Sequence, residues 1–286
     1  MHNITEAKHI QDEKPELSAI NIEIMLLLEA IYCKYGYDFR SYSRAHIKRR
    51  ILNRLTRSNL ESVSCMQHKV LNDESFFQTL LLDFSLNVTE MFRDPKFFIA
   101  MREQVIPLLK TYPFYKIWHA GCSTGEEVYS MSILLKEEKL LDRCLIYATD
   151  FNQSVLEKAA EGIFPVENMK GYSINYKNSG GLNSFSDYFT VKYDAAMLDK
   201  SLKSKIVFAD HNLVTDGVFG EMNVIVCRNV LIYFNRELQN KVLGLFYESL
   251  VPGGILCLGT KESLAFSPYN DKFVKLGNMN IFKKKY

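Results

Sequence analysis

Apolar residues recur at helical spacing between Leu17 and about Phe84. Residues three and four positions apart lie on one face of a helix, so this period predicts amphipathic helices. We predict a small all-helical domain over residues 17–85, after a polar tail over residues 1–16. Its helices are expected at Ile22–Tyr35, Arg44–Arg57 and Phe76–Phe84, separated by Gly36, Ser58-Asn59 and Asn72-Asp73.

From Lys116 onward, short apolar runs alternate with helical stretches. This order is typical of a doubly wound, Rossmann-like α/β sheet, and we predict such a domain over residues 86–286. The first three predicted strands end in polar residues, at the edge where open α/β sheets place their binding sites. The predicted strands are Lys116–Ala120, Cys144–Thr149, Asn223–Cys227, Ile255–Leu258 and Asn280–Lys283.

An aromatic-rich stretch interrupts this alternation between about Phe164 and Lys205, around Ser179-Gly180-Gly181. Strands favour aromatic residues, and turns favour glycine. We therefore predict a small β-subdomain, a meander or hairpin, inserted at about 164–205. Its aromatic residues are Tyr172, Tyr176, Phe185, Tyr188, Phe189 and Tyr193.

Charge and cysteine content narrow the function classes. The 286 residues carry 35 Lys and Arg against 33 Asp and Glu, which gives no global field for nucleic acid or an anionic membrane. Six scattered cysteines lack zinc-site spacing and are expected to be small buried hydrophobes in a reducing compartment. The most apolar early run, 22–33, is too short to cross a bilayer. We expect a monomer in the cytoplasm that binds no metal ion and does not insert into a membrane.

The first predicted strand leads into a glycine turn, Ala120-Gly121-Cys122-Ser123-Thr124-Gly125-Glu126-Glu127. A phosphate at the following helix would be repelled by Glu126 and Glu127, which disfavours a dinucleotide. S-adenosylmethionine has no phosphate and carries an ammonium and a sulfonium, so carboxylates near this turn would be compatible with it. Ser123 and Glu126 have the spacing of a capping box, which is the structural explanation for Glu126. Glu127 is either a cofactor ligand or a partner of the helix dipole.

Asp150 follows the second predicted strand, 25 residues after Gly125. In mononucleotide-binding βαβ units, an acid about 20 residues after the glycines accepts the ribose hydroxyls. The alternative is that Asp150 caps a helix at Gln153–Glu161, which Gly162 would end. We favour the cofactor interpretation.

Two later segments bring further polar residues to this edge. The apolar run Val207–Leu213 ends in side chains able to hold an adenine ring. His211 taken alone is expected to be a surface histidine and not a catalytic base. Arg228 and Asn229 follow the third predicted strand and are expected over the same cleft.

Arg93 lies in the loop that joins the two predicted domains. Asp94 as N-cap and Pro95 at the first helical position should begin a helix that runs to about Leu109. Taken alone, Arg93 would be a solvated loop residue.

Five ordered motifs stand at compatible spacing: Asn87-Val88-Thr89 with Phe92-Arg93-Asp94-Pro95, the turn Gly121 to Glu127, Ala148-Thr149-Asp150, His211-Asn212-Leu213, and Cys227-Arg228-Asn229 with Ile232-Tyr233-Phe234. Together they resemble the CheR family, the chemotaxis-receptor glutamate O-methyltransferases, and the resemblance extends from about Leu17 to Phe282. It implies a class I S-adenosylmethionine-dependent methyltransferase domain with a helical domain before it and a β-subdomain inserted in it.

The resemblance also implies an activity: methylation of glutamate carboxylates on a chemotaxis-type receptor protein, with S-adenosylhomocysteine as product. Arg93 and Tyr233 would be the catalytic residues nearest the methyl group. The alternatives are a methyltransferase for a small molecule, and a signalling adaptor that binds the cofactor without catalysis. The residues implied around the cofactor are Asn87, Thr89, Arg93, Glu127, Asp150, Asn212, Leu213, Arg228 and Asn229.

The predicted helix Arg44–Arg57 contains basic residues and no acid. Ile47 and Ile51 share one face, whereas most of the basic residues share another. This basic face is either simply solvated or, as the family's substrate would require, docks onto an acidic receptor. The basic residues are Arg44, Lys48, Arg49, Arg50, Arg54 and Arg57.

A further prediction concerns the β-subdomain. An exposed strand edge of this subdomain could bind a partner peptide.

Overall fold

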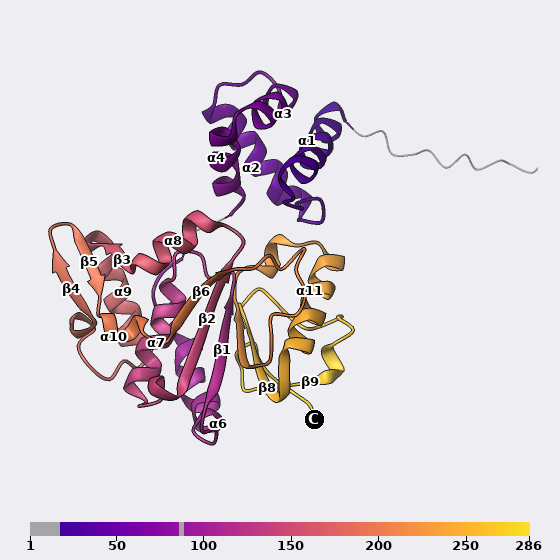
Figure 1. Cartoon of the computed structure of the whole chain (residues 1–286). Coiled ribbons are helices and arrows are strands. Elements are labelled where there is room, and N and C mark those ends of the chain that lie inside the picture. Colours follow the sequence, from indigo (N-terminus) through magenta and orange to yellow (C-terminus); the bar gives the residue numbers. More distant parts are fainter. Residues whose placement is uncertain (1–17, 86–88) are drawn as a thin grey trace, which may run out of the picture.

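The computed structural model describes residues 18–85 and 89–286. The predicted tail at 1–16 and the predicted site residue Asn87 therefore lie outside the described residues. The N-terminal part is helical, as predicted, and Figure 1 shows its helices packed together above the central sheet. These helices are α1 (Ala19–Tyr35), α2 (Arg44–Arg57), α3 (Val63–Asn72) and α4 (Glu74–Phe84).

Helix α3 was not predicted. Ser62 begins it by accepting the backbone N–H of Cys65, and Asp73 begins α4 in the same way from Phe76. The side chains of serine and aspartate at these positions satisfy N–H groups that a helix cannot pair internally. Two short polar breaks, rather than one long loop, therefore separate α2, α3 and α4.

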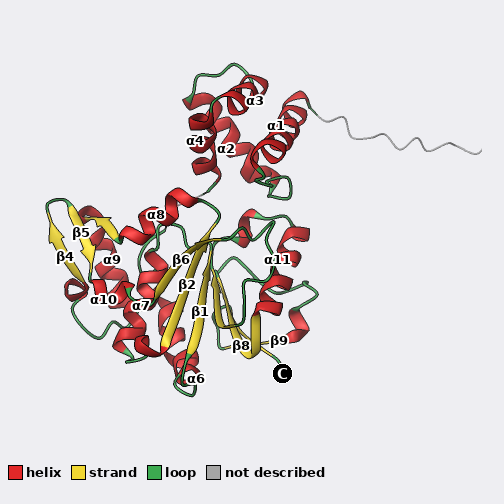
Figure 2. Cartoon of the chain, in the orientation of Figure 1, coloured by secondary structure: helices red, strands yellow, loops and turns green. Residues whose placement is uncertain are grey.

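A seven-stranded sheet forms the centre of the remaining chain, in the order β6-β2-β1-β7-β8-β10-β9. The first five strands in this order are parallel, and β10 pairs antiparallel with both β8 and β9. The doubly wound α/β prediction is confirmed, and Figure 2 shows helices on both sides of the sheet. The strands are β1 (Tyr115–Ala120), β2 (Cys144–Asp150), β6 (Ile206–Asp210), β7 (Met222–Cys227), β8 (Leu250–Leu258), β9 (Phe273–Leu276) and β10 (Ile281–Lys284).

Strands β6 and β9 were not predicted as strands. They form the two edges of the sheet, and most of their residues are exposed or only partly buried. The apolar residues of β6 were interpreted as part of the adenine end of a binding site and not as a strand, and β9 has only four residues. Both edge strands were therefore missed, although each contains apolar residues.

Alternate side chains divide the core into two layers. On one face of the sheet, Trp118 and Leu256 pack with α11 (Arg236–Ser249) and with the N-terminal helices. On the other face, Ile117 and Val226 belong to the layer that contains α7 and α5. The N-terminal helices thus share a hydrophobic core with the α/β domain. The remaining helices around the sheet are α5 (Pro95–Ala100), a π-helical turn (Met101–Val105), α6 (Ile106–Leu109), α7 (Glu126–Glu137) and α8 (Gln153–Glu161).

The inserted segment contains the predicted small sheet, with three antiparallel strands in the order β3-β5-β4. The prediction of a meander or hairpin is wrong for its first half, which is helical. Tyr172 and Tyr176 lie four residues apart and are both buried on α9, so they follow a helical period rather than a strand's. The insertion comprises β3 (Ile163–Pro165), α9 (Val166–Asn178), β4 (Phe189–Lys192), β5 (Ala195–Leu198) and α10 (Lys200–Lys203).

Candidate active site

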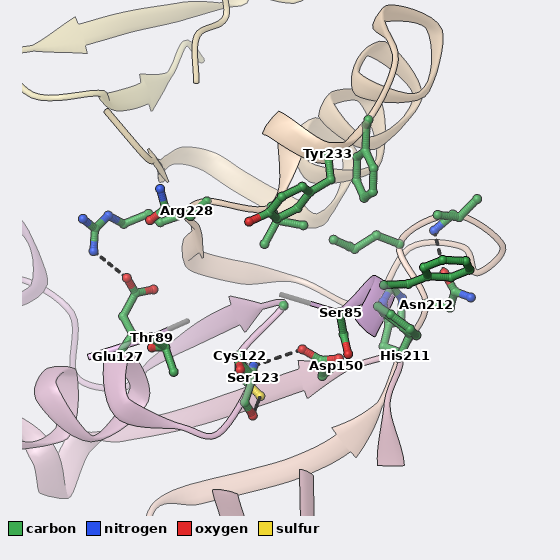
Figure 3. Close-up of a pocket in the computed structure, with 18 of the residues that line it drawn as sticks. Ser85, Thr89, Cys122, Ser123, Glu127, Asp150, His211, Asn212, Arg228 and Tyr233 are labelled. Atoms are coloured by element: carbon green, nitrogen blue, oxygen red, sulfur yellow. Dashed lines mark hydrogen bonds and ion pairs between the residues drawn. The ribbon is translucent and has the colours of Figure 1, made fainter. Parts of the chain in front are cut away.

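A pocket lies at the carboxyl ends of β1, β2, β6 and β7. The N-terminal domain contributes Tyr42, from the connection between α1 and α2, and Phe84 of α4 to its wall. Figure 3 shows residues from these segments pointing into one space. Every predicted site residue that the structure describes lines this pocket. These residues are Thr89, Arg93, Glu127, Asp150, Asn212, Leu213, Arg228, Asn229 and Tyr233.

The glycine turn after β1 is held by the end of β2. Thr149 O accepts the backbone N–H groups of Gly121 and Cys122, both at 2.8 Å. Gly121 has a φ of +77°, and a Cβ there would lie 2.6 Å from Cγ2 of Val230, another residue that lines the pocket. Only glycine fits this position without displacing Val230.

The predicted capping box between Ser123 and Glu126 is wrong. Helix α7 has Gly125 as its N-cap, with no capping side chain. Glu126 instead accepts the hydroxyl of Thr124 at 2.7 Å, and the backbone N–H of Ser123 points to Asp150. Because Ser123 has a φ of +51°, its backbone is turned away from the geometry that a capping residue adopts.

Asp150 is buried and organises this turn. Its carboxylate accepts the backbone N–H of Ser123 at 3.0 Å and that of Asn152 at 3.1 Å. The alternative that Asp150 caps α8 is wrong, because Asn152 is the N-cap and accepts the N–H of Ser154. Burial raises the pKa of Asp150 to about 6, although backbone N–H groups oppose this rise.

Glu127, Arg228 and Asp94 form a charged group beside the turn, in which Arg228 is buried and both carboxylates are partly exposed. Arg228 is 1% exposed in its side chain and donates to Glu127 at 2.5 Å and to Asp94 at 2.6 Å. Its Nη2 also donates to the carbonyl oxygen of Arg93 at 3.2 Å. Burial alone would raise the pKa of Glu127, but Arg228 and His119 hold it below its ordinary value.

Asp94 stands at the predicted N-cap position of α5, but its side chain does not cap the helix. The carboxylate is turned to Arg228 instead, and the residue adopts a φ of +56°. Aspartate tolerates this left-handed conformation better than most residues do. The sequence signal for a helix start was therefore correct in position, while the side chain has a different partner.

Tyr233 lies where the N-terminal helices meet the α/β domain. Its carbonyl oxygen accepts the backbone N–H of Ser43 at 2.7 Å, and its ring packs edge-on against His46 at 5.2 Å. Burial raises the pKa of Tyr233, while the charges of Arg50 and Arg93 act in the opposite direction. Both guanidinium groups thus act electrostatically on this phenol, although Arg93 and Tyr233 come from distant parts of the chain.

The expectation that His211 is a surface residue is wrong. Only 7% of this residue is exposed, and its ring packs edge-on against Trp118 and Phe219. Its Nε2 lies 3.1 Å from the carbonyl oxygen of Gly217. His211 is therefore part of the pocket wall beside Asn212.

Glu262 was not identified from the sequence. Its buried carboxylate accepts backbone N–H groups from Asn229, Val230 and Leu231 at 3.1, 2.8 and 2.8 Å, and from Gly259 at 2.5 Å. It thereby fixes the turn that carries Asn229 and leads to Tyr233. The only signal in the sequence is an acid shortly after a strand end, which is too common to single out a residue.

All six cysteines are free thiols. Four are buried as expected, but Cys33 and Cys65 are exposed on α1 and α3, so the prediction is wrong for these two. Among residues 18–85 and 89–286, no cluster of His, Cys, Asp or Glu could hold a metal ion. The helices in these same ranges include none that is long and apolar enough to cross a membrane.

Comparison with known proteins gives two matches to family models. Residues 22–85 match the all-alpha domain of CheR methyltransferases, and residues 87–280 match their SAM binding domain. The chain is 53% identical to a Pseudomonas putida protein named Cher3, over 92% of this chain and 97% of that protein. It is 31% identical to chemotaxis protein methyltransferase 2 of Vibrio cholerae, over 82% and 83% of the two chains. The chemotaxis protein methyltransferase of Listeria monocytogenes is 28% identical, over 87% and 92%.

Proposed function

The chain belongs to the CheR methyltransferase family, and we propose that it transfers the methyl group of S-adenosylmethionine to glutamate side chains of a chemotaxis-type receptor. The products are glutamyl methyl esters and S-adenosylhomocysteine. The observation that carries this proposal is the pair of carboxylates, Glu127 and Asp150, on either side of the glycine turn (Figure 3). They match the ammonium and the ribose hydroxyls of one ligand that carries no phosphate.

The residues of the pocket fit this cofactor. Glu127, held ionised, would accept the ammonium group, and Asp150 would accept the ribose hydroxyls. His211 and Leu213 would contact the adenine ring. Asn212 fixes this end of the pocket, since its backbone N–H donates to Asp216 at 2.8 Å and its side chain accepts the N–H of Val214 at 3.0 Å.

When bound, S-adenosylmethionine supplies an electrophilic methyl group, which an ionised carboxylate can take up without a general base. A glutamate side chain has an ordinary pKa of about 4.3, so it is already ionised at neutral pH. The work of the protein is therefore positioning. We infer that Arg93 orients the incoming carboxylate by charge-assisted hydrogen bonds, and that Tyr233 confines it with its ring and hydroxyl.

We propose that the receptor docks on the basic face of α2. The geometry of α2 divides the basic residues into two groups. Arg54 is ion-paired with Asp83 of α4, Arg57 lies 3.9 Å from the same carboxylate, and Lys48 donates to Asn21 of α1. Arg44 and Arg49 are exposed, and Arg50 acts on Tyr233. This second group supports docking of an acidic helix near the pocket, whereas Arg54 contributes to the packing of the domain.

A second contact with the receptor is proposed at the inserted sheet. β4 is an edge strand of this sheet, and Val191 on it is 60% exposed. Tyr193, directly after β4, is 88% exposed. An unpaired strand edge with apolar side chains suits an extended peptide that adds a further strand.

The exposed thiols of Cys33 and Cys65 suit a reducing compartment, and we propose that the protein acts in the cytoplasm.

The test uses methyl-labelled cofactor, the purified chain and receptor-containing membranes. We expect label on one protein, released as methanol by alkali because esters are base-labile. A receptor with its candidate glutamates replaced by glutamine is the control and should stay unlabelled. Label only in small molecules would instead favour a small-molecule methyltransferase. Cofactor binding without any transfer would favour an inactive adaptor.

A further inference from the structure

The side chain of Arg228 is shielded from solvent by several protein partners. A residue that only bound the cofactor would not need these partners. It stands at the end of β7, and its guanidinium carbon lies 4.1 Å from the ring centre of Phe97 on α5. Its Nη1 donates to Glu127, at the start of α7, and its Nη2 donates to Asp94 and to the carbonyl oxygen of Arg93. One side chain therefore joins three segments of the pocket wall.

Arg228 pairs one positive charge with two carboxylates, those of Glu127 and Asp94. Glu127 also lies 3.4 Å from Nδ1 of His119. Both terminal nitrogens of the Arg228 guanidinium have carboxylate partners, and its Nε is buried without a hydrogen-bond partner.

We propose that Asp94 and Arg228 are positioning residues that fasten the loop carrying Arg93 to the ammonium end of the cofactor pocket. This inference rests on the proposed function, because it gives Arg93 the task of orienting the incoming carboxylate. Arg228 fixes the carbonyl of Arg93 directly and fixes the next residue through Asp94. The backbone of Arg93 is thereby set by the same guanidinium that neutralises part of the charge of Glu127.

Two substitutions separate the role of charge from that of geometry among Glu127, Arg228 and Asp94. Asp94→Asn removes the charge but tolerates the left-handed φ of +56°, so the backbone need not change for steric reasons. Arg228→Lys keeps the charge but loses the planar fork that reaches two carboxylates at once. Arg102→Lys is a matched control, because Arg102 also joins two carboxylates, Glu137 and Glu138, and also has a buried Nε, yet it does not line the pocket.

The experiment measures single-turnover methyl transfer at saturating cofactor, together with cofactor affinity by calorimetry. We expect Asp94→Asn and Arg228→Lys to lower the rate by about ten-fold or more, with cofactor affinity changed by less than about three-fold for Asp94→Asn. Arg102→Lys should keep the rate. A wild-type rate in Asp94→Asn, or an equal loss in Arg102→Lys, would overturn the proposal.

A second measurement needs no turnover. Hydrogen exchange should quicken in a peptide covering residues 89–97 of Asp94→Asn, where Phe92 N–H donates to Ser130 and Phe97 N–H donates to Asp94 O. Unchanged exchange there would also overturn the proposal. If the wild-type chain transfers no methyl group, the proposed function fails, whereas the exchange result still decides whether the loop is fastened in this way.

Discussion

The carboxylate of Asp150 accepts the backbone N–H of Ser123 at 3.0 Å, so the end of β2 fixes the glycine turn that follows β1. The same carboxylate lines the pocket with 7% of the residue exposed. The carboxylate thus holds the backbone of the glycine turn. In the proposed function, its remaining lone pairs accept the ribose hydroxyls of the cofactor. Its ionisation should govern cofactor binding, because hydroxyl groups donate most strongly to a charged acceptor.

The first prediction is a loss of cofactor affinity in acid. Burial raises the pKa of Asp150 to about 6, so the ionised form that accepts hydroxyls dominates above this pH and is lost below it. The dissociation constant for S-adenosylhomocysteine should therefore rise by about ten-fold per pH unit below about pH 6. Calorimetry between about pH 5 and 7.5 checks this. Asp150→Asn should bind more weakly at neutral pH and show a flatter profile, and an unchanged slope would remove Asp150 from the site.

Part of the pocket could be predicted because its residues follow apolar runs, whereas Thr89, Arg93 and Tyr233 were implied only by the resemblance to the CheR family. Asp150 and Arg228 stand directly at the ends of β2 and β7, and parallel strands bring such ends to one edge. The turn after β1 was recognisable from its glycines and acids. These signals are local, so one sequence was enough to place them.

The partners of these residues could not be predicted. Asp94 pairs with Arg228, 134 positions later, and Glu262 binds a turn that begins 33 positions earlier. The burial of His211 depends on Trp118 and Phe219, which come from other segments. Such contacts depend on how elements pack, and a pattern of residue types along the chain does not encode that directly. Helix α9 was missed for a different reason, since aromatic content outweighed its helical spacing.

The second prediction concerns the two proposed catalytic residues. Arg93→Ala should lower the single-turnover rate on the order of a hundred-fold, because a misplaced nucleophile reacts slowly even when bound. Arg93→Lys should restore little of the rate, since it lacks the planar fork. Tyr233→Phe should cost about three- to ten-fold, the worth of one hydrogen bond, because the ring remains. Cofactor affinity, measured by calorimetry, should change much less than these rates. A wild-type rate in Arg93→Ala would reduce Arg93 to a loop residue.

The third prediction tests the basic face of α2. Arg44 and Arg49 are exposed and do not line the cofactor pocket, so reversing both to glutamate should leave cofactor affinity unchanged. The KM for the receptor should rise by about ten-fold at low salt, and its salt dependence should flatten. Lys275→Glu on β9 makes one such charge change far along the sheet and is the control. Arg54→Glu is unsuitable, because it would place an acid beside Asp83 and destabilise the domain.

Equal KM values for Arg44→Glu/Arg49→Glu and the wild type at low salt would contradict docking on α2. The basic face of this helix would then be an ordinary solvated surface. A raised KM in Lys275→Glu as well would point to net charge rather than to a docking surface. The receptor titration should therefore be repeated at two ionic strengths for all three proteins, since screening separates an electrostatic contact from a structural loss.

The last prediction concerns Glu262, whose two oxygens accept two backbone N–H groups each. In Glu262→Gln, one oxygen becomes an amide nitrogen that faces two donors, and this buried mismatch should lower the free energy of unfolding by about 1–3 kcal/mol. Because the turn carries Asn229 and leads to Tyr233, the rate of methyl transfer should fall as well. Glu137→Gln is the control, since the side chain of Glu137 is fully buried and accepts from Leu182 N–H and Tyr188 outside the pocket, in addition to its ion pair with Arg102. Thermal unfolding should show both variants destabilised, whereas single-turnover assays below the transition should show a slow rate only for Glu262→Gln. Equal rates in the two variants would mean that Glu262 acts on stability alone.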